Sequence, residues 1–381
     1  MVSTNILKDS TDLININEKC HLLLTLRITL KHMSWAKEYL ILNDGSRVEA
    51  MAPVIISASR STDIPAFYSD WFFHRLRCGY SVWTNPFNGV KSYISYKNTR
   101  FIVFWSKNPR PIIPYLEELK KDGIGCYIQF TLNDYVEEGL EKSVPTVESR
   151  IETFKELVKI LGVGRVIWRF DPLVLTDTIT IDVLLAKIER IADQLKGYCE
   201  KLVFSFVDIS LYKKVETNLK RNNIHYLEWT QDLMEEFASR LSELNKRWGY
   251  ELATCGERID IEKYGIKHNK CVDDELMIRF ASEDAVLMKH LGVEVHETDL
   301  FGDMPEGSIP VGDGRYAVRK KNIKDKGQRA FCGCIASKDI GEYNTCPHQC
   351  EYCYANSSKE VATNNYKRHL ASPLSETITG I

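Results

Sequence analysis

Short apolar runs alternate with amphipathic helical patterns through the middle of the chain, and this alternation constrains the fold most strongly. Helical patterns lie at 146–161, 182–195 and 231–248. Such alternation indicates a parallel sheet whose strands are joined by crossover helices. It predicts an α/β protein with a TIM-like (β/α) barrel, and a doubly wound open sheet is the alternative. Seven runs are predicted as strands: 54–57, 81–84, 101–105, 126–131, 166–170, 201–207 and 251–254.

Segments of different character flank this pattern. Residues 39–51 hold two apolar stretches around Asn-Asp-Gly-Ser, which predicts a hairpin. After Gly256 the periodicity decays, apart from a short helical pattern near 273–281, and Gly and Pro become frequent over 301–314. We therefore expect an N-terminal extension with a hairpin at 1–52, a barrel at 53–300, and a C-terminal lid that carries a cysteine-rich segment at 301–381.

Composition narrows the class of protein. Hydrophobic residues make up 44% and charged residues 27% of the chain, as in soluble globular proteins. The formal net charge of -2 argues against a globally basic nucleic-acid binder. The apolar stretch at 20–30 is far shorter than the ~20 residues that cross a bilayer. We therefore expect no membrane contact. Eleven cysteines, an odd number, do not indicate a disulfide framework, so we expect a cytoplasmic protein.

Polar side chains cluster where the predicted strands end, which is where barrel enzymes place their active sites. Any one of these charges also fits a helix cap or a solvated loop. Arg169 differs, because it lies inside an apolar strand between Trp168 and Phe170 and needs an anionic partner or ligand if buried. The candidate catalytic residues at these ends are Arg60, Asp63, Lys107, Arg169, Asp171 and Glu257.

Cys346, Cys350 and Cys353 form a C-x3-C-x2-C run in an irregular segment. Short gaps of this kind allow three thiolates to converge on a [4Fe-4S] cluster and leave one iron open. A zinc knuckle, with His348 as a further ligand, and a set of unrelated buried thiols are the alternatives.

A second set of cysteines accompanies the first. Cys332 and Cys334 form a C-x-C pair, and Cys255 and Cys271 flank the end of the last predicted strand. If the tail folds back over the barrel mouth, these four thiols suit a second iron-sulfur cluster or a zinc ion. The alternative is that Cys255 and Cys271 pack in the core and that the C-x-C pair is a flexible thiol pair.

The segment 315–329 carries seven Lys or Arg and one acid, directly before the cysteines. Such a run is ordinarily a solvated loop. It also suits a phosphate, a cofactor carboxylate or a nucleic-acid backbone, although no regularly interleaved aromatic residues support base stacking.

The segment 345–356 resembles the cluster motif of the radical S-adenosylmethionine (SAM) superfamily, with Tyr352 as the aromatic residue before the last cysteine. The resemblance implies that Tyr352 lies at the cofactor and that the open iron binds and cleaves SAM. Two differences stand out. The superfamily's cluster loop follows the first barrel strand, whereas this one follows the last predicted strand, and no Gly-Gly-Glu segment is present. Because the first and last strands of a closed barrel are neighbours, a tail loop reaches the same mouth.

Most of the chain, about 54–357, resembles an uncharacterised bacterial family, domain of unknown function 1848. The resemblance implies a TIM-like domain with a C-terminal cysteine cluster and implies no particular reaction. The segments that carry it are 57–63, 104–109, 167–172, 205–208 and 332–356.

Together these features predict an iron-sulfur enzyme of the radical SAM type that acts on an unidentified, anionic substrate and takes electrons from a donor. Arg169 is a candidate cofactor ligand beside Tyr352. One alternative is a hydrolase or lyase with structural metal sites, in which Asp63, Asp171, Asp208 or Glu257 does the acid–base work. The other is a non-enzymatic iron-sulfur module for redox sensing or nucleic-acid binding.

Overall fold

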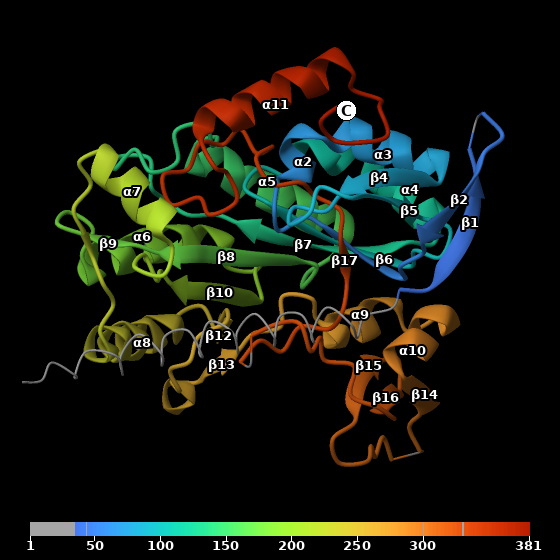
Figure 1. The fold of residues 1–381 in the computed structure, drawn as a ribbon. Helices are drawn as coiled ribbons and strands as arrows, with labels where there is room; N and C mark the ends of the chain where they lie inside the picture. The colour runs from blue at the N-terminus through green and yellow to red at the C-terminus, as the bar shows by residue number, and fades with distance from the viewer. Residues whose placement is uncertain (1–34, 43, 300, 330) are drawn as a thin grey trace, which may run out of the picture.

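The computed structural model describes residues 35–42, 44–299, 301–329 and 331–381, so most of the predicted N-terminal extension lies outside the described residues. Its centre is a parallel sheet of eight strands (Figure 1). In spatial order these strands are β17 (Lys338–Asp339), β3 (Ile55–Ala58), β6 (Phe101–Ser106), β7 (Gly125–Thr131), β8 (Val166–Leu173), β10 (Lys201–Phe206), β12 (Glu251–Thr254) and β13 (Ile266–His268).

The order of the strands follows the chain from β3 to β13, and β17 then returns to the edge beside β3. Lys338 pairs with Ile56 and Asp339 with Ser57. No pairing between described residues joins β13 to β17, so the hydrogen-bonded strands form an open row. A parallel sheet with sequential strands is compatible with a TIM-like or a Rossmann-like α/β fold.

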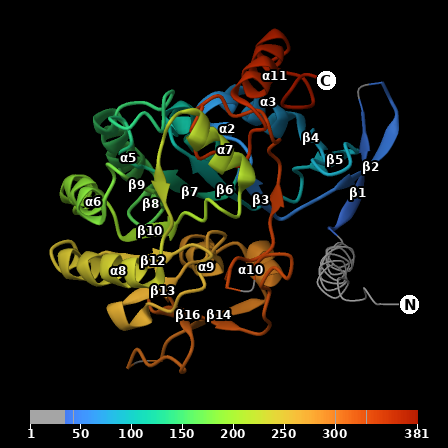
Figure 2. The same cartoon turned by 60° about the vertical axis from the view of Figure 1, so that its left-hand side comes forward.

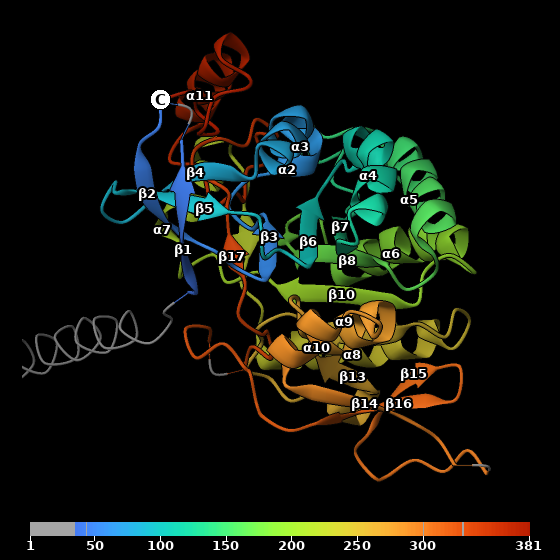
Figure 3. The same ribbon diagram turned by 90° about the vertical axis from the view of Figure 1, so that its right-hand side faces the viewer.

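Helices cover one face of the sheet (Figure 3). Phe130 of β7 stacks on Phe154, and Phe204 of β10 meets Phe237 edge to face. Thr146, Thr180 and Thr230 cap three of these helices by accepting a hydrogen bond from a first-turn amide. The helices of this face are α3 (Ser69–Cys78), α4 (Leu116–Lys121), α5 (Val147–Leu161), α6 (Ile181–Leu195) and α8 (Gln231–Asn245).

The other face packs against α9 (Asp274–Ala281), α10 (Ala285–Leu291) and a small antiparallel sheet of β14 (Val293–Glu297), β16 (Arg315–Arg319) and β15 (Ile309–Gly312) (Figure 2). Alternate strand residues enter this second core, among them Phe101, Tyr127 and Val203. Because both faces are buried, the strands read as continuous apolar runs rather than as alternating ones.

A four-stranded sheet lies beside the edge strands, in the order β1 (Lys37–Ile41), β2 (Arg47–Met51), β5 (Lys91–Ser95) and β4 (Tyr80–Thr84). The antiparallel pair β1 and β2 confirms the predicted hairpin. The prediction that 81–84 belongs to the main sheet is wrong, because β4 pairs antiparallel with β5. Only a short loop joins these two strands, and a parallel crossover needs a dozen or more residues.

The predicted helices are confirmed, although α8 ends at Asn245 rather than at 248. The strands β13 and β17 were missed because they are only three and two residues long. Among the described residues, no helix has the length and apolarity needed to cross a membrane. The remaining elements are α2 (Ile64–Phe67), η1 (Arg110–Tyr115), β9 (Leu175–Thr176), α7 (Lys213–Arg221), β11 (Tyr226–Leu227), η2 (Glu262–Tyr264) and α11 (Lys359–Ala371).

Asp339 ties β17 to the end of β3. Its Oδ1 accepts hydrogen bonds from Ser59 Oγ at 2.8 Å and from the Gly341 amide at 3.0 Å, and its Oδ2 accepts from the Arg60 amide at 2.8 Å. Gly341 lies so close to Ser59 that a Cβ there would overlap the serine side chain. This contact fixes the point at which the C-terminal segment leaves the sheet.

We expect Asp339→Asn to lower the free energy of unfolding by about 1–3 kcal/mol, because an amide nitrogen in place of one oxygen leaves buried donors without an acceptor. Urea unfolding followed by circular dichroism measures the change. Asp122→Asn, at an exposed carboxylate, is the matched control and should behave as wild type. An equal effect of the two substitutions would contradict the role assigned to Asp339.

Candidate functional site

Cysteines from distant parts of the chain gather where the parallel strands end. These cysteines form two groups. The loop thiols are Cys346, Cys350 and Cys353, in the segment that follows β17. The second thiol group consists of Cys255, which follows β12, Cys271, which lies shortly after β13, and Cys332 and Cys334. All ten described cysteines are free thiols.

The backbone folds the loop thiols toward one another. Gln349, between the first two cysteines, has a left-handed conformation with φ of 59°. Asn356 Nδ2 donates to the Cys346 carbonyl at 2.7 Å, and Tyr68 Oη donates to the Thr345 carbonyl. The charges of Cys353 and Cys346 both act on Cys350, so the three sulfur atoms share one neighbourhood.

His348 and Asp63 anchor this loop to the sheet. His348 Nε2 lies 2.7 Å from Asp63 Oδ2, and its Nδ1 lies 3.1 Å from the Ser143 carbonyl. Both ring nitrogens are therefore engaged with oxygen atoms of the protein, and neither is free to bind a metal. Asp63 also accepts from the Ala66 amide, from Ser106 Oγ and from the Lys107 amide. Asp63 is therefore a fully engaged positioning residue.

Tyr352 holds the other end of the loop through a buried charge network. Lys107 Nζ donates to Glu141 Oε1 at 2.7 Å and to Tyr352 Oη at 2.8 Å, and Tyr352 Oη also donates to Glu141. Arg150 Nη1 lies 3.6 Å from Glu141 Oε2. Burial raises the pKa of Glu141, but the charges of Lys107 and Arg150 outweigh it and bring the pKa to about 2.

Burial disfavours the thiolate forms of Cys346 and Cys350 by raising the pKa of each thiol. It raises the pKa of Cys346 to about 12, with a further contribution from Asp63. It also raises the pKa of Cys350, against the opposing charge of Lys107. A positively charged metal centre removes this obstacle, because metal-bound thiols are deprotonated.

The second thiol group is a chain of contacts. The Sγ atoms of Cys255 and Cys271 lie 3.2 Å apart. The Cys271 amide donates to Cys334 Sγ at 3.1 Å, and Cys334 also interacts with the thiols of Cys271 and Cys332. The charges of Arg169 and Arg60 act on Cys271 and Cys332, respectively. Four thiols and two cations therefore occupy one site.

Arg169 joins this group to the strand ends, as its position inside an apolar strand suggested. Its Nη1 donates to Cys271 Sγ at 3.2 Å and its Nη2 to Asp171 Oδ2 at 2.5 Å. Asp171 accepts a further hydrogen bond from Ser205 Oγ. Arg60 is different, because its guanidinium forms no ion pair with the described residues and lies over the ring of Trp105.

Glu257 follows Cys255 of the second thiol group by two residues. Its Oε1 accepts a hydrogen bond from the Phe206 amide at 2.9 Å. Burial, together with the charges of Asp208 and Asp171, raises the pKa of Glu257 to about 7. A carboxyl group with this pKa exchanges protons near neutral pH.

The structure thus places the predicted site residues in three neighbourhoods. Asp63, Lys107 and Tyr352 support the loop thiols, Arg60, Arg169 and Asp171 surround the second thiol group, and Glu257 lies beside Asp171. Sequence reasoning missed Glu141, which lies outside any helix or strand. The only signal for it was an acid close to the end of a predicted strand.

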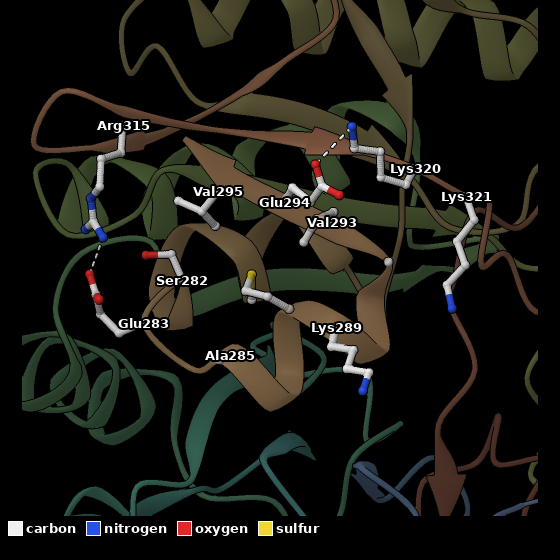
Figure 4. Close-up of a pocket in the computed structure, with 12 residues that line it drawn as sticks. Ser282, Glu283, Ala285, Lys289, Val293, Glu294, Val295, Arg315, Lys320 and Lys321 are labelled. Atoms are coloured by element: carbon white, nitrogen blue, oxygen red, sulfur yellow. Dashed lines mark hydrogen bonds and ion pairs between the residues drawn. The ribbon is translucent and has the colours of Figure 1, made fainter. Parts of the chain in front are cut away.

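The basic segment 315–329 is engaged with acids over part of its length. Arg315 pairs with Glu283, Arg319 with Asp274 and Glu275, and Lys320 with Glu294. Two of these pairs border a cavity of about 650 Å³ between α10 and β14, shown in Figure 4. None of the predicted site residues lines that cavity.

Within the described residues, no group of three or more His, Cys, Asp or Glu side chains is arranged to hold a metal ion. A [4Fe-4S] cluster does not require such an arrangement, because each thiolate binds a different iron. The loop thiols supply three ligands on a buried loop, with the cations Lys107 and Lys214 acting on Cys350 and Cys353. Asn356 Oδ1 is buried beside them without a hydrogen-bond partner. This donor set fits the cluster.

Fold and site together define a parallel-sheet α/β protein with two groups of cysteines at the carboxyl edge of its sheet. More specifically, the chain belongs to the family described as Domain of unknown function (DUF1848), which matches residues 55–355. No curated protein and no solved structure gives a significant match.

We expect Glu141→Gln to lower the free energy of unfolding by about 3–5 kcal/mol, because it leaves two buried cations without their anion. Chemical denaturation at neutral pH measures this. The control is Glu137→Gln, at an exposed carboxylate, which should change stability by no more than about 0.5 kcal/mol. A mild effect of Glu141→Gln would show that Lys107 and Arg150 do not depend on this carboxylate.

The raised pKa of Glu257 predicts a pH-dependent stability. The folded protein binds more protons than the unfolded chain between the ordinary Glu pKa of about 4.5 and its raised value of about 7, so stability falls as pH rises through this window. Glu257→Gln should remove up to about 3 kcal/mol of that fall. Thermal unfolding from pH 4 to 8 measures it, with the exposed Glu262→Gln as control. Parallel curves for wild type and Glu257→Gln would refute the assignment.

Proposed function

We propose that the protein is an iron-sulfur enzyme resembling the radical SAM proteins. In this proposal Cys346, Cys350 and Cys353 hold a [4Fe-4S] cluster at the mouth of a TIM-like barrel. The observation that carries it is that three thiols of a C-x3-C-x2-C motif, one buried and two half-buried, converge at the carboxyl edge of a parallel sheet. The free thiols of the described cysteines favour a reducing compartment such as the cytoplasm.

The position of β17 supports the resemblance. In radical SAM proteins the cluster loop follows the first strand of the barrel. Here the loop follows the last strand in sequence, yet β17 occupies the first place in the spatial order, beside β3. The loop therefore starts from an equivalent place through a permuted connection. The sequential parallel order also favours a sheet that curves into an incomplete or complete barrel.

The chain's own residues would position the cluster and keep water away from it. When bound, the cluster supplies the electron for reductive cleavage of SAM, and it receives that electron from an external donor. Asp63 and His348 hold one side of the loop, and Lys107 with Glu141 holds Tyr352 on the other. Buried and mutually hydrogen-bonded groups of this kind fix ligand geometry.

The proposed substrate is anionic. Arg60 is a partly buried cation at the end of β3 with no ion pair among the described residues. The charge of Asp339 acts on Arg60, but no carboxylate of the described residues forms an ion pair with its guanidinium, which can therefore bind a carboxylate or phosphate of a ligand. Arg169 is less available, because Asp171 and Cys271 already accept its hydrogen bonds.

Glu257 favours a second candidate, acid–base chemistry at the same mouth. A pKa of about 7 suits a general acid or base, and Asp171 and Asp208 lie near it. Asp63 does not fit this alternative, because its four hydrogen bonds already engage the carboxylate. The thiol groups would then be structural.

Anaerobic purification followed by iron and sulfide analysis tests the proposal. We expect about four irons and four sulfides per chain from a cluster on the loop thiols. The EPR signal of the reduced protein should change when SAM is added. Cys350→Ala should abolish the signal, whereas Cys199→Ala, a buried cysteine on the helix-covered face, should retain it. A protein without iron, or a signal that SAM leaves unchanged, would overturn the proposal and favour the acid–base alternative.

A further inference from the structure

The second thiol group differs from the loop thiols in the number of hydrogen bonds that its sulfur atoms accept. Four N–H groups point at two of its sulfur atoms. The amides of Cys271 and Val272 donate to Cys334 Sγ at 3.1 and 3.4 Å. Asn269 Nδ2 and Arg169 Nη1 donate to Cys271 Sγ at 3.4 and 3.2 Å.

This number of donors exceeds what neutral thiols require. A thiol sulfur is only a weak acceptor, so burying a guanidinium and an amide against it gains little. A thiolate bound to a metal accepts such hydrogen bonds strongly, and they tune the metal from outside its ligands. Arg60 adds a second cation without an ion pair among the described residues. The surroundings therefore match a net negative centre.

The spacing of the sulfur atoms selects the kind of centre. In a tetrahedral zinc site, a Zn–S bond of about 2.3 Å places neighbouring sulfur atoms about 3.8 Å apart. The Sγ atoms of Cys255 and Cys271 lie 3.2 Å apart, close to that spacing. In a [4Fe-4S] cluster the thiolates bind different irons and lie much farther apart. The compact thiols thus favour one shared ion over a second cluster.

The topology brings these ligands together from three places. Cys255 follows β12, Cys271 lies two residues before the cap of α9, and the C-x-C pair precedes β17. The Cys271 carbonyl accepts hydrogen bonds from Tyr127 Oη and Gln129 Nε2, which fixes this residue over β7. An ion held here would join the main sheet to the C-terminal segment.

We infer that Cys255, Cys271, Cys332 and Cys334 bind a single Zn²⁺ ion. Arg169 stabilises the negative charge of the thiolates through its hydrogen bond to Cys271 Sγ. In the structure the four thiols form a chain of contacts and not a closed set of ligands, so binding requires side-chain rotations that bring all four sulfur atoms to one ion. The role is structural, because four protein ligands leave no open position for substrate.

The test uses the full chain with Cys346→Ala, Cys350→Ala and Cys353→Ala combined, so that the loop thiols contribute no metal. We expect about one zinc per chain and no acid-labile sulfide. Adding Cys271→Ala should cause loss of the zinc. Adding Cys126→Ala, a buried cysteine on β7 outside both thiol groups, should not. Circular dichroism checks that each variant folds.

Cobalt gives a second measurement that needs no variant of the site itself. Co²⁺ loaded into the protein without loop thiols should show the absorption bands of a tetrahedral four-thiolate ion. Zinc that persists after Cys271→Ala, weak octahedral cobalt bands, iron with sulfide, or a Cys255–Cys271 disulfide would each overturn the inference. Because the loop thiols are absent, these outcomes do not depend on whether the iron-sulfur proposal holds.

Discussion

The pairing of β17 with β3 is the contact on which the rest of the site depends. It comprises only two residue pairs, but Asp339 reinforces it by accepting hydrogen bonds from the segment that follows β3. The direction of β17 is parallel, so the chain leaves it at the same edge as all the other strands. Without this parallel return, the chain would not carry the loop thiols to Lys107 and Asp63.

Paired charges in a buried, low-dielectric environment hold the loop against the sheet. Glu141 faces the cations Lys107 and Arg150, and Asp63 faces the buried ring of His348. Asp63 joins His348 of the loop to the segment after β3. Glu141 binds Lys107, which in turn donates to Tyr352 of the loop. Removing one partner of such a pair costs much free energy, because the other charge is then left buried and unpaired. The pairs therefore favour a single arrangement of the loop over many. Thiols that are held in one arrangement lose little further conformational entropy when a ligand binds them.

Much of the fold could be predicted because strands buried on both faces leave long apolar runs in the sequence. The same signal failed at 81–84, where β4 is equally apolar but has an antiparallel partner close by in the chain. The cysteine sets were visible from spacing alone. Glu141 and Asp339 were not, because their partners are decided by the tertiary fold: Ser59 and Asp339 are 280 residues apart in sequence. Asp63 was likewise predicted as a catalytic residue from its place after a strand. Its hydrogen bonds, which the sequence does not reveal, show a carboxylate that supports the loop.

The return of β17 also has a consequence for the order of events during synthesis. The ribosome delivers β3 through β13 before β17, and until then the apolar strand β3 is an exposed sheet edge, of the kind that pairs with other chains. The segment that covers this edge is the one that carries the loop thiols. A chain therefore gathers those thiols at the carboxyl edge of the sheet only when β17 has covered the edge at β3. The gathering of the loop thiols is in this way coupled to completed folding, and an incomplete chain offers no finished thiol group.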